Sequence, residues 1–225
     1  MRNIFYTVAI MAGLLFGVSS VQAADSVATA VQKRYATISG MQAEFTQVLE
    51  HQESGDKEKR IGTLHFLKPL SFRWETKDPI PELLLVTPEA IWNAFPDEDM
   101  AYKYSSEISQ EMDSLVRLVT GQSNLEKDFY IENKGTKGGL ATLILDARNP
   151  TVTMTTVELV VEAKTGTIKQ VTIIDFYNNR NAITFTSQLL DPKLDASVFT
   201  FIPPKGMKVE ERAKDGAFSK PLMQW

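Results

Sequence analysis

The sequence contains no cysteine and only two histidines. Without cysteine the chain has no disulfide framework and no residue behind its leader to acylate, so it folds by packing alone. His51 falls in a polar stretch and His65 on a predicted strand, and there is no HExxH motif, so a zinc site or a His-dependent triad has little to build from. We predict that both histidines face solvent, and we expect no catalytic residue, metal or cofactor.

The net charge is small, and charged residues of one sign are not concentrated in any long stretch. The 225 residues carry 24 basic and 28 acidic side chains, for a net charge of −4. Nucleic-acid-binding proteins usually show a basic face or stripe, and anionic lipid headgroups require a dense Lys/Arg cluster. Neither is present in the sequence, so nucleic acid is excluded as an expected partner.

The first residues have the features of an export signal. Arg2 gives a positive start, Ile4 to Val18 form a short apolar run, and Val21-Gln22-Ala23 match the small-residue pattern at a signal-peptidase site. No later stretch approaches the ~20 apolar residues of a membrane helix. We therefore expect residues 1–23 to be a cleaved signal peptide and 24–225 to be one soluble, exported domain. Its net charge is −5 once Arg2 is removed.

Two stretches have helical periodicity. Asp25 to Ser39 places Val27, Val31, Tyr35 and Ile38 on one face, with Asp25 as N-cap and Gly40 beyond the end. Ser105 to Gly121 does the same with Ile108, Met112, Leu115 and Val119, and Gly121 would stop it. Each is expected to be an amphipathic helix.

Most of the remaining apolar residues alternate with polar ones, which is typical of strands. The polar run His51–Arg60 is predicted to be a hairpin loop, and Thr165-Gly166 and Asn178-Asn179 to be tight turns. The predicted strands begin near Met41 and include 64–66, 72–74, 83–86, 90–95, 140–146, 155–163, 168–176 and 182–189. Together they predict a mainly β fold with some helix, namely an unclosed antiparallel barrel with helices against its concave side.

Two short motifs resemble ligand sites but do not qualify. Lys134–Gly139 is rich in glycine but lacks the spacing of a phosphate-binding loop, and a hairpin is the better interpretation. The acidic run Asp97–Asp99 does not follow the EF-hand pattern and is most simply a solvated loop. No motif supports an enzyme.

The stretch KPLSFRWETKDP, residues 68–79, places Phe72 and Trp74 on one face of a strand. Further large apolar side chains occur on neighbouring strands. From periodicity alone an ordinary core is the simpler interpretation of this aromatic face, and a ligand cavity is the alternative.

Three motifs, in order, resemble the periplasmic outer-membrane lipoprotein carrier family, LolA. They are MQAEFTQ (41–47), GTLHFLKPLSFRW (62–74) and FTFIPPKGMKV (199–209). The resemblance runs from about Asp25 to Lys214. It implies an apolar cavity beneath a helical lid, which receives the acyl chains of a lipoprotein from an inner-membrane ABC transporter and delivers them to an outer-membrane receptor. It also implies a monomer.

The same resemblance assigns residues to the parts of this site. The lid underside would consist of Ile108, Met112, Leu115 and Val119. The cavity lining would consist of Phe45, Leu64, Phe66, Phe72, Trp74, Leu83, Leu85, Trp92 and Phe95. A periplasmic carrier of free lipid, or a lipoprotein-sensing module on the same half-barrel, are the alternatives.

The sequence departs from the family pattern at three places. Lys68 replaces an arginine that in the family is thought to bond lid carbonyls, and lysine lacks the planar multi-donor fork. Lys68 is therefore expected to gate the lid differently. Thr87-Pro88-Glu89 replaces a common Asp-Gly turn, and a C-terminal extension from about residue 210 outruns the last motif.

Overall fold

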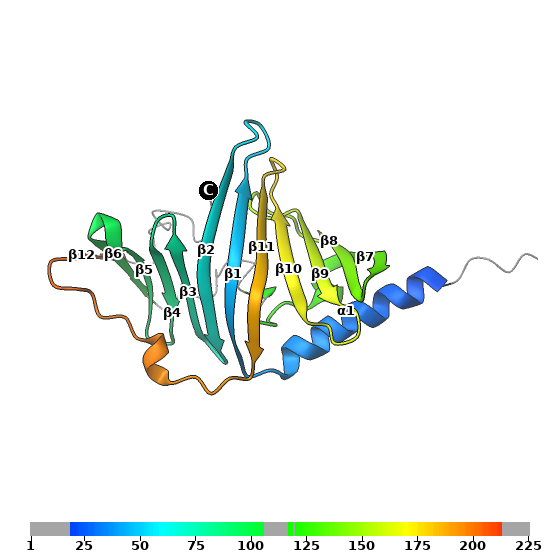
Figure 1. Ribbon diagram of the computed structural model, residues 1–225, viewed down its shortest axis with the longest axis horizontal. Helices are drawn as coiled ribbons and strands as arrows, with labels where there is room; N and C mark the ends of the chain where they lie inside the picture. Colours follow the sequence, from blue (N-terminus) through cyan, green and yellow to red (C-terminus); the bar gives the residue numbers. More distant parts are fainter. Residues whose placement is uncertain (1–18, 106–116, 119, 213–225) are drawn as a thin grey trace, which may run out of the picture.

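The computed structural model describes residues 19–105, 117–118 and 120–212 (Figure 1). Its elements are α1 (Ser19–Thr37), β1 (Gly40–Glu50), β2 (Lys57–Leu67), β3 (Ser71–Asp78), β4 (Glu82–Val86), β5 (Ala90–Phe95), η1 (Pro96–Glu98), β6 (Met100–Ser105), α3 (Leu125–Asp128), β7 (Phe129–Lys137), β8 (Leu140–Ala147), β9 (Thr156–Glu162), β10 (Ile168–Ile174), β11 (Arg180–Leu190), η3 (Ala196–Phe199) and β12 (Lys208–Arg212).

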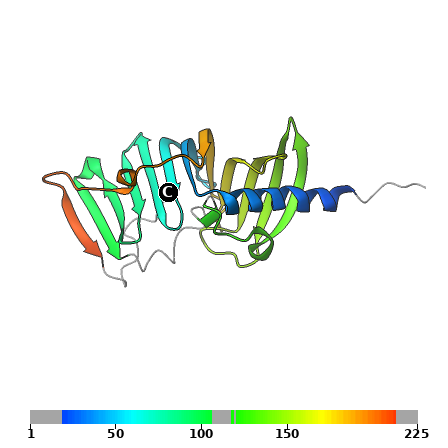
Figure 2. The same ribbon diagram turned by 90° about the horizontal axis from the view of Figure 1, so that it is seen from below.

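All twelve strands form one sheet, in the order β12-β6-β5-β4-β3-β2-β1-β11-β10-β9-β8-β7. Neighbours pair antiparallel except β12, which runs parallel to β6. The sheet curves strongly, and its edge strands β12 and β7 lie at opposite ends (Figures 1 and 2). The predicted unclosed antiparallel barrel is confirmed.

Helix α1 lies along the β7–β11 half of the sheet (Figure 2). We term the face that it covers the inner face and the opposite face the outer face. The predicted apolar positions on the helix join the inner-face core, and the buried Tyr35 hydroxyl accepts a hydrogen bond from Ile168 N at 3.2 Å. Burial raises the pKa of Tyr35 to about 12. The inner face of this half is therefore filled by the chain's own helix.

The predicted bounds of this helix were wrong at both ends. It begins at Ser19 rather than capping at Asp25, which lies within it, because Val21 to Ala24 include good helix formers. It ends at Thr37 because Ser39 N and Ser39 Oγ donate to Asp191 Oδ1, at 2.6 and 2.9 Å. These hydrogen bonds lower the pKa of Asp191.

Strand β4 is buried on both faces of the sheet, which explains its unbroken apolar sequence. Leu84 and Val86 join the inner-face core, whereas Leu83 and Leu85 join a second cluster with Phe199. The C-terminal segment after β11 passes η3 and reaches the far edge as β12 (Figure 1). That segment therefore covers the outer face of β4–β6.

The turns and loops are only partly as predicted. Gly166 and Asn178 adopt positive φ, of 71° and 62°. The predicted two-residue turns are wrong, however, because residues 163–167 separate β9 from β10 and residues 175–179 separate β10 from β11. The loop after β1 spans only residues 51–56, because Lys57 to Arg60 pair with β1. Strands β6, β7 and β12 were not predicted.

The described residues contain no helix long and apolar enough to cross a membrane. They also contain no cluster of three His, Asp or Glu placed to hold a metal ion. His51 is exposed, but His65 is half-buried beside Arg73, and burial and the nearby guanidinium lower its pKa.

Candidate functional site

Aromatic side chains from β1 and β3 meet on the inner face. The ring centroids of Phe45 and Trp74 are 4.0 Å apart, and those of Phe72 and Trp74 are 6.5 Å apart. Leu64 and Phe66 on β2 adjoin them, and Phe72 and Trp74 are each only 2% exposed. The alternation within these three strands thus brings five of the predicted cavity residues together.

A glycine on β2 shapes this cluster. Gly62 lies opposite Phe45 in the β1–β2 register, and a Cβ there would be 2.5 Å from Phe45 Cζ. The Phe45 ring therefore occupies the place of a side chain on β2 and lies against Trp74. A larger residue at 62 would displace the Phe45 ring.

The other four predicted cavity residues divide between the two faces. Phe95 lies four residues after Ile91 on β5, and alternate residues of a strand share a face, so Phe95 also faces inward. Its ring centroid is 6.1 Å from that of Tyr102. The structure places Leu83, Leu85 and Trp92 on the outer face, because the β4–β5 register pairs Leu85 with Trp92. Trp92 packs edge-on against Phe201, with centroids 5.3 Å apart. These three residues belong to the layer beneath the C-terminal segment.

The predicted lid residues Ile108, Met112, Leu115 and Val119 lie outside the described residues. The end of the predicted helix is described: Arg117 and Leu118 are helical, Leu118 is buried, and Gly121 has φ of 73°. Gln122 N donates to Arg117 O at 2.7 Å, which closes the last turn. Gly121 therefore terminates a helix, as predicted.

Lys68, in the β2–β3 turn, contacts the end of α1. Its ammonium donates to the carbonyl oxygens of Tyr35 at 2.6 Å and Ala36 at 3.3 Å. A cation at a helix C-terminus is favourable because the last carbonyls have no partner within the helix. Burial lowers the pKa of Lys68, and the Asp191 carboxylate opposes this shift. Among the described residues, Lys68 thus joins the β2–β3 turn to α1.

Lys68→Met is expected to lower the free energy of unfolding by about 1–2 kcal/mol, because two helix carbonyls lose a charged donor. Lys68→Arg retains a cation and is the matched control, with an expected loss of less than about 0.5 kcal/mol. Urea unfolding monitored by circular dichroism measures both values. Equal stability of Lys68→Met and the parent would show that this contact contributes nothing.

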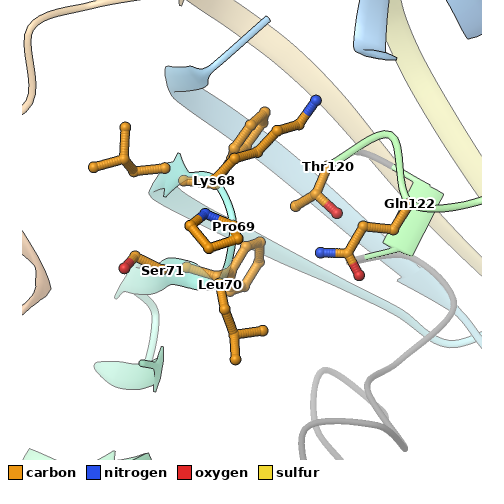
Figure 3. Close-up of a pocket in the computed structure, with 9 residues that line it drawn as sticks. Lys68, Pro69, Leu70, Ser71, Thr120 and Gln122 are labelled. Atoms are coloured by element: carbon orange, nitrogen blue, oxygen red, sulfur yellow. The ribbon is translucent and has the colours of Figure 1, made fainter. Parts of the chain in front are cut away.

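A small pocket adjoins this contact. It is lined on one side by the turn from Lys68 to Leu70 and on the other by Thr120 and Gln122 (Figure 3). Its volume is about 10 Å³, which has room for roughly one water molecule. The pocket as it stands is therefore too small for an acyl chain.

Sequence reasoning missed two residues near the site. Gln32 on α1 donates from Nε2 to Ser123 O at 3.1 Å and accepts at Oε1 from Leu125 N at 2.9 Å, so it ties the helix to the segment before β7. Asn93 lies on the inner face of β5 and is 1% exposed. The sequence could have predicted this residue, because Asn93 is a polar side chain between Ile91 and Phe95 on the inward face of the strand.

Comparisons with known proteins agree with this geometry. Residues 36–202 match the family profile described as outer membrane lipoprotein carrier protein LolA. An outer-membrane lipoprotein carrier protein of Chromobacterium violaceum is 26% identical over 83% of this chain and 90% of its own. One from Vibrio parahaemolyticus is 25% identical over 92% and 97%.

Among solved structures, an uncharacterized conserved protein from Thermus thermophilus superposes with a TM-score of 0.56 at 13% identity, and the match covers 85% of this chain and 100% of that one. That likeness shows a shared fold. The family match spans most of the chain, and the relatives are covered almost end to end. The chain therefore belongs to the outer membrane lipoprotein carrier protein LolA family.

Proposed function

We propose that the chain is a periplasmic carrier that takes lipoproteins by their acyl chains from an inner-membrane ABC transporter and delivers them to an outer-membrane receptor. Membership in the carrier family supports a lipoprotein carrier role in general. The observation that carries the specific proposal is the inner-face cluster of Phe45, Phe72 and Trp74 on the half of the sheet that α1 does not cover.

The proposed acyl-binding surface consists of the predicted residues that face inward: Phe45, Leu64, Phe66, Phe72, Trp74 and Phe95. The helix predicted over Ser105–Gly121 would cover it, with the apolar lid positions turned toward the chains. Since α1 occupies the β7–β11 half, opening that lid is the movement that would expose acyl-sized space. Met112 suits such a role because a flexible thioether adapts to irregular chains.

The energetics favour a cavity that is only moderately tight. Complete burial of roughly forty methylenes at ~0.8 kcal/mol each would give ~30 kcal/mol, beyond the ~20 kcal/mol of the tightest non-covalent complexes. A carrier must also release its load. Incomplete burial of the chains, or a costly lid opening, therefore suits the function, and the receptor must bind more tightly than the carrier.

The hydrogen bonds from Lys68 to α1 are expected to affect how readily the predicted lid opens. Lys68 lies beside the pocket that Thr120 and Gln122 close, so the predicted lid ends against the turn that Lys68 anchors. We expect Lys68→Met to change the rates at which a fluorescent acyl probe enters and leaves. Stopped-flow rates identical to those of the parent would separate Lys68 from gating.

A release assay tests the function directly. Mature chain added to spheroplasts is expected to bring an acylated lipoprotein into the supernatant as a soluble one-to-one complex, whereas buffer or heat-denatured chain releases none. Lipoprotein that stays on the membrane while the chain takes up phospholipid would favour a free-lipid carrier. A complex that forms but transfers nothing to outer membranes would favour a sensing module.

A further inference from the structure

Asn93 is a buried amide without a hydrogen-bond partner among the described residues. It is 1% exposed, and neither its Nδ2 nor its Oδ1 bonds to any atom of residues 19–105, 117–118 or 120–212. In the strand registers it lies opposite Leu84 on β4 and Tyr102 on β6, and Leu84 in turn lies opposite Trp74. Asn93 is therefore placed on the same face as the aromatic cluster proposed to hold acyl chains.

The other two buried amide residues in the described part of the chain, Gln47 and Asn179, are paired. Gln188 is half-buried and its Oε1 lacks a partner, but its Nε2 donates to Ile168 O at 2.7 Å. Gln47, 1% exposed on the inner face of β1, donates to Asn181 Oδ1 at 2.9 Å. Asn179 donates to Asp175 Oδ2 at 2.8 Å and accepts from Gln52 N at 3.0 Å. An unpaired donor and acceptor in an apolar setting are costly, and leucine would fit the pattern of this strand without that cost.

A ligand that offers both an acceptor and a donor would satisfy Asn93. A hydrocarbon offers neither, and the ester linkage between an acyl chain and a glycerol backbone offers only acceptor oxygens. An acylated peptide terminus offers the carbonyl oxygen of its acyl group and the N–H groups of its backbone. The chemistry of Asn93 thus matches the polar end of an N-acylated peptide better than that of a phospholipid.

We propose that Asn93 binds the amide-linked acyl group of a cargo lipoprotein, with Nδ2 donating to the acyl carbonyl and Oδ1 accepting a backbone N–H. This proposal rests on the proposed function and deepens it. Asn93 is then a specificity residue that fixes the position of the polar end of the cargo. The acyl chains lie along the aromatic cluster.

Three probes with the same acyl chain test it: an N-palmitoyl peptide, a palmitoyl ester without a peptide, which keeps the carbonyl but has no backbone N–H, and the corresponding ether, which has neither. Competition against a fluorescent acyl probe gives each affinity. We expect the parent to prefer amide over ester and ester over ether, by about three- to tenfold for each hydrogen bond lost. Asn93→Leu is expected to bind all three with equal affinity.

Controls separate binding from folding. Gln47→Leu removes a buried amide that already has a partner, so the ranking of the probes should stay as in the parent. Asn93→Leu should unfold at the same or a higher denaturant concentration than the parent, since it removes two unpaired polar groups. Asn93→Ala serves as a second variant if the leucine does not fit.

The outcomes distinguish the two proposals. Equal affinity of the parent for the three probes would overturn the role of Asn93 and leave the carrier function standing. Ester and amide bound equally, both above ether, would show that only the donor is used and would point to free phospholipid. Failure of all three probes to bind would overturn the carrier function itself.

Discussion

Trp74→Glu is expected to lower the affinity of the chain for a fluorescent acyl probe by about 100-fold or more. The indole lies between the rings of Phe45 and Phe72 on the inner face, so a carboxylate there would be desolvated by a bound chain. A cost of ~3 kcal/mol corresponds to that loss. Probe titration by fluorescence measures it, with circular dichroism to confirm the fold.

The chain supplies a matched control on the other side of the same sheet. Trp92 faces outward and contacts Phe201 and the Lys103 ammonium, the latter 5.6 Å from the ring centroid. Trp92→Glu is expected to leave probe affinity within about threefold of the parent while loosening the C-terminal segment. Equal losses in the two variants would mean that the inner face has no special part in binding. Trp74→Gln repeats the test without a charge.

Gly121→Ala is expected to lower the free energy of unfolding by about 3 kcal/mol or more. Gly121 has φ of 73°, and an added Cβ would lie 2.7 Å from the carbonyl carbon of Tyr35 and close to its oxygen. That oxygen is the one to which Lys68 donates. The alanine would therefore push the predicted lid away from α1 and disturb the Lys68 contact.

Gly55, in the β1–β2 turn, isolates the steric effect. It has the same φ of 73°, but an added Cβ would have no atom of the described chain within 4 Å. Gly55→Ala should therefore cost only about 1 kcal/mol, the penalty for a left-handed backbone. Denaturant unfolding of both variants gives the difference. Similar losses in the two variants would show that the close approach of Gly121 to the Tyr35 backbone does not contribute to the free energy of unfolding.

Local periodicity was enough to predict most of the sheet but not how its faces are used. The alternation of Phe72 and Trp74 placed both correctly on one face. The run Leu83–Val86 has no alternation, so the sequence could not separate Leu83 and Leu85 from Leu84 and Val86. That division depends on the C-terminal segment, which lies more than a hundred residues away in the chain.

The three strands that were not predicted, β6, β7 and β12, have weak alternation of apolar and polar residues. β7 and β12 are the edges of the sheet and carry many charged residues, which is usual for edge strands. The contact of Lys68 with α1 was not predicted, for a different reason. The sequence marked Lys68 as unusual, but only the packing of the helix against the β2–β3 turn brings Tyr35 O within reach.

Native mass spectrometry of the chain purified gently from periplasm would show most directly whether it carries acylated protein. We expect the mass of residues 24–225 plus one intact acylated lipoprotein, with the complex lost in Trp74→Glu and kept in Trp92→Glu. A chain that is empty, or that holds only free phospholipid, would contradict this expectation.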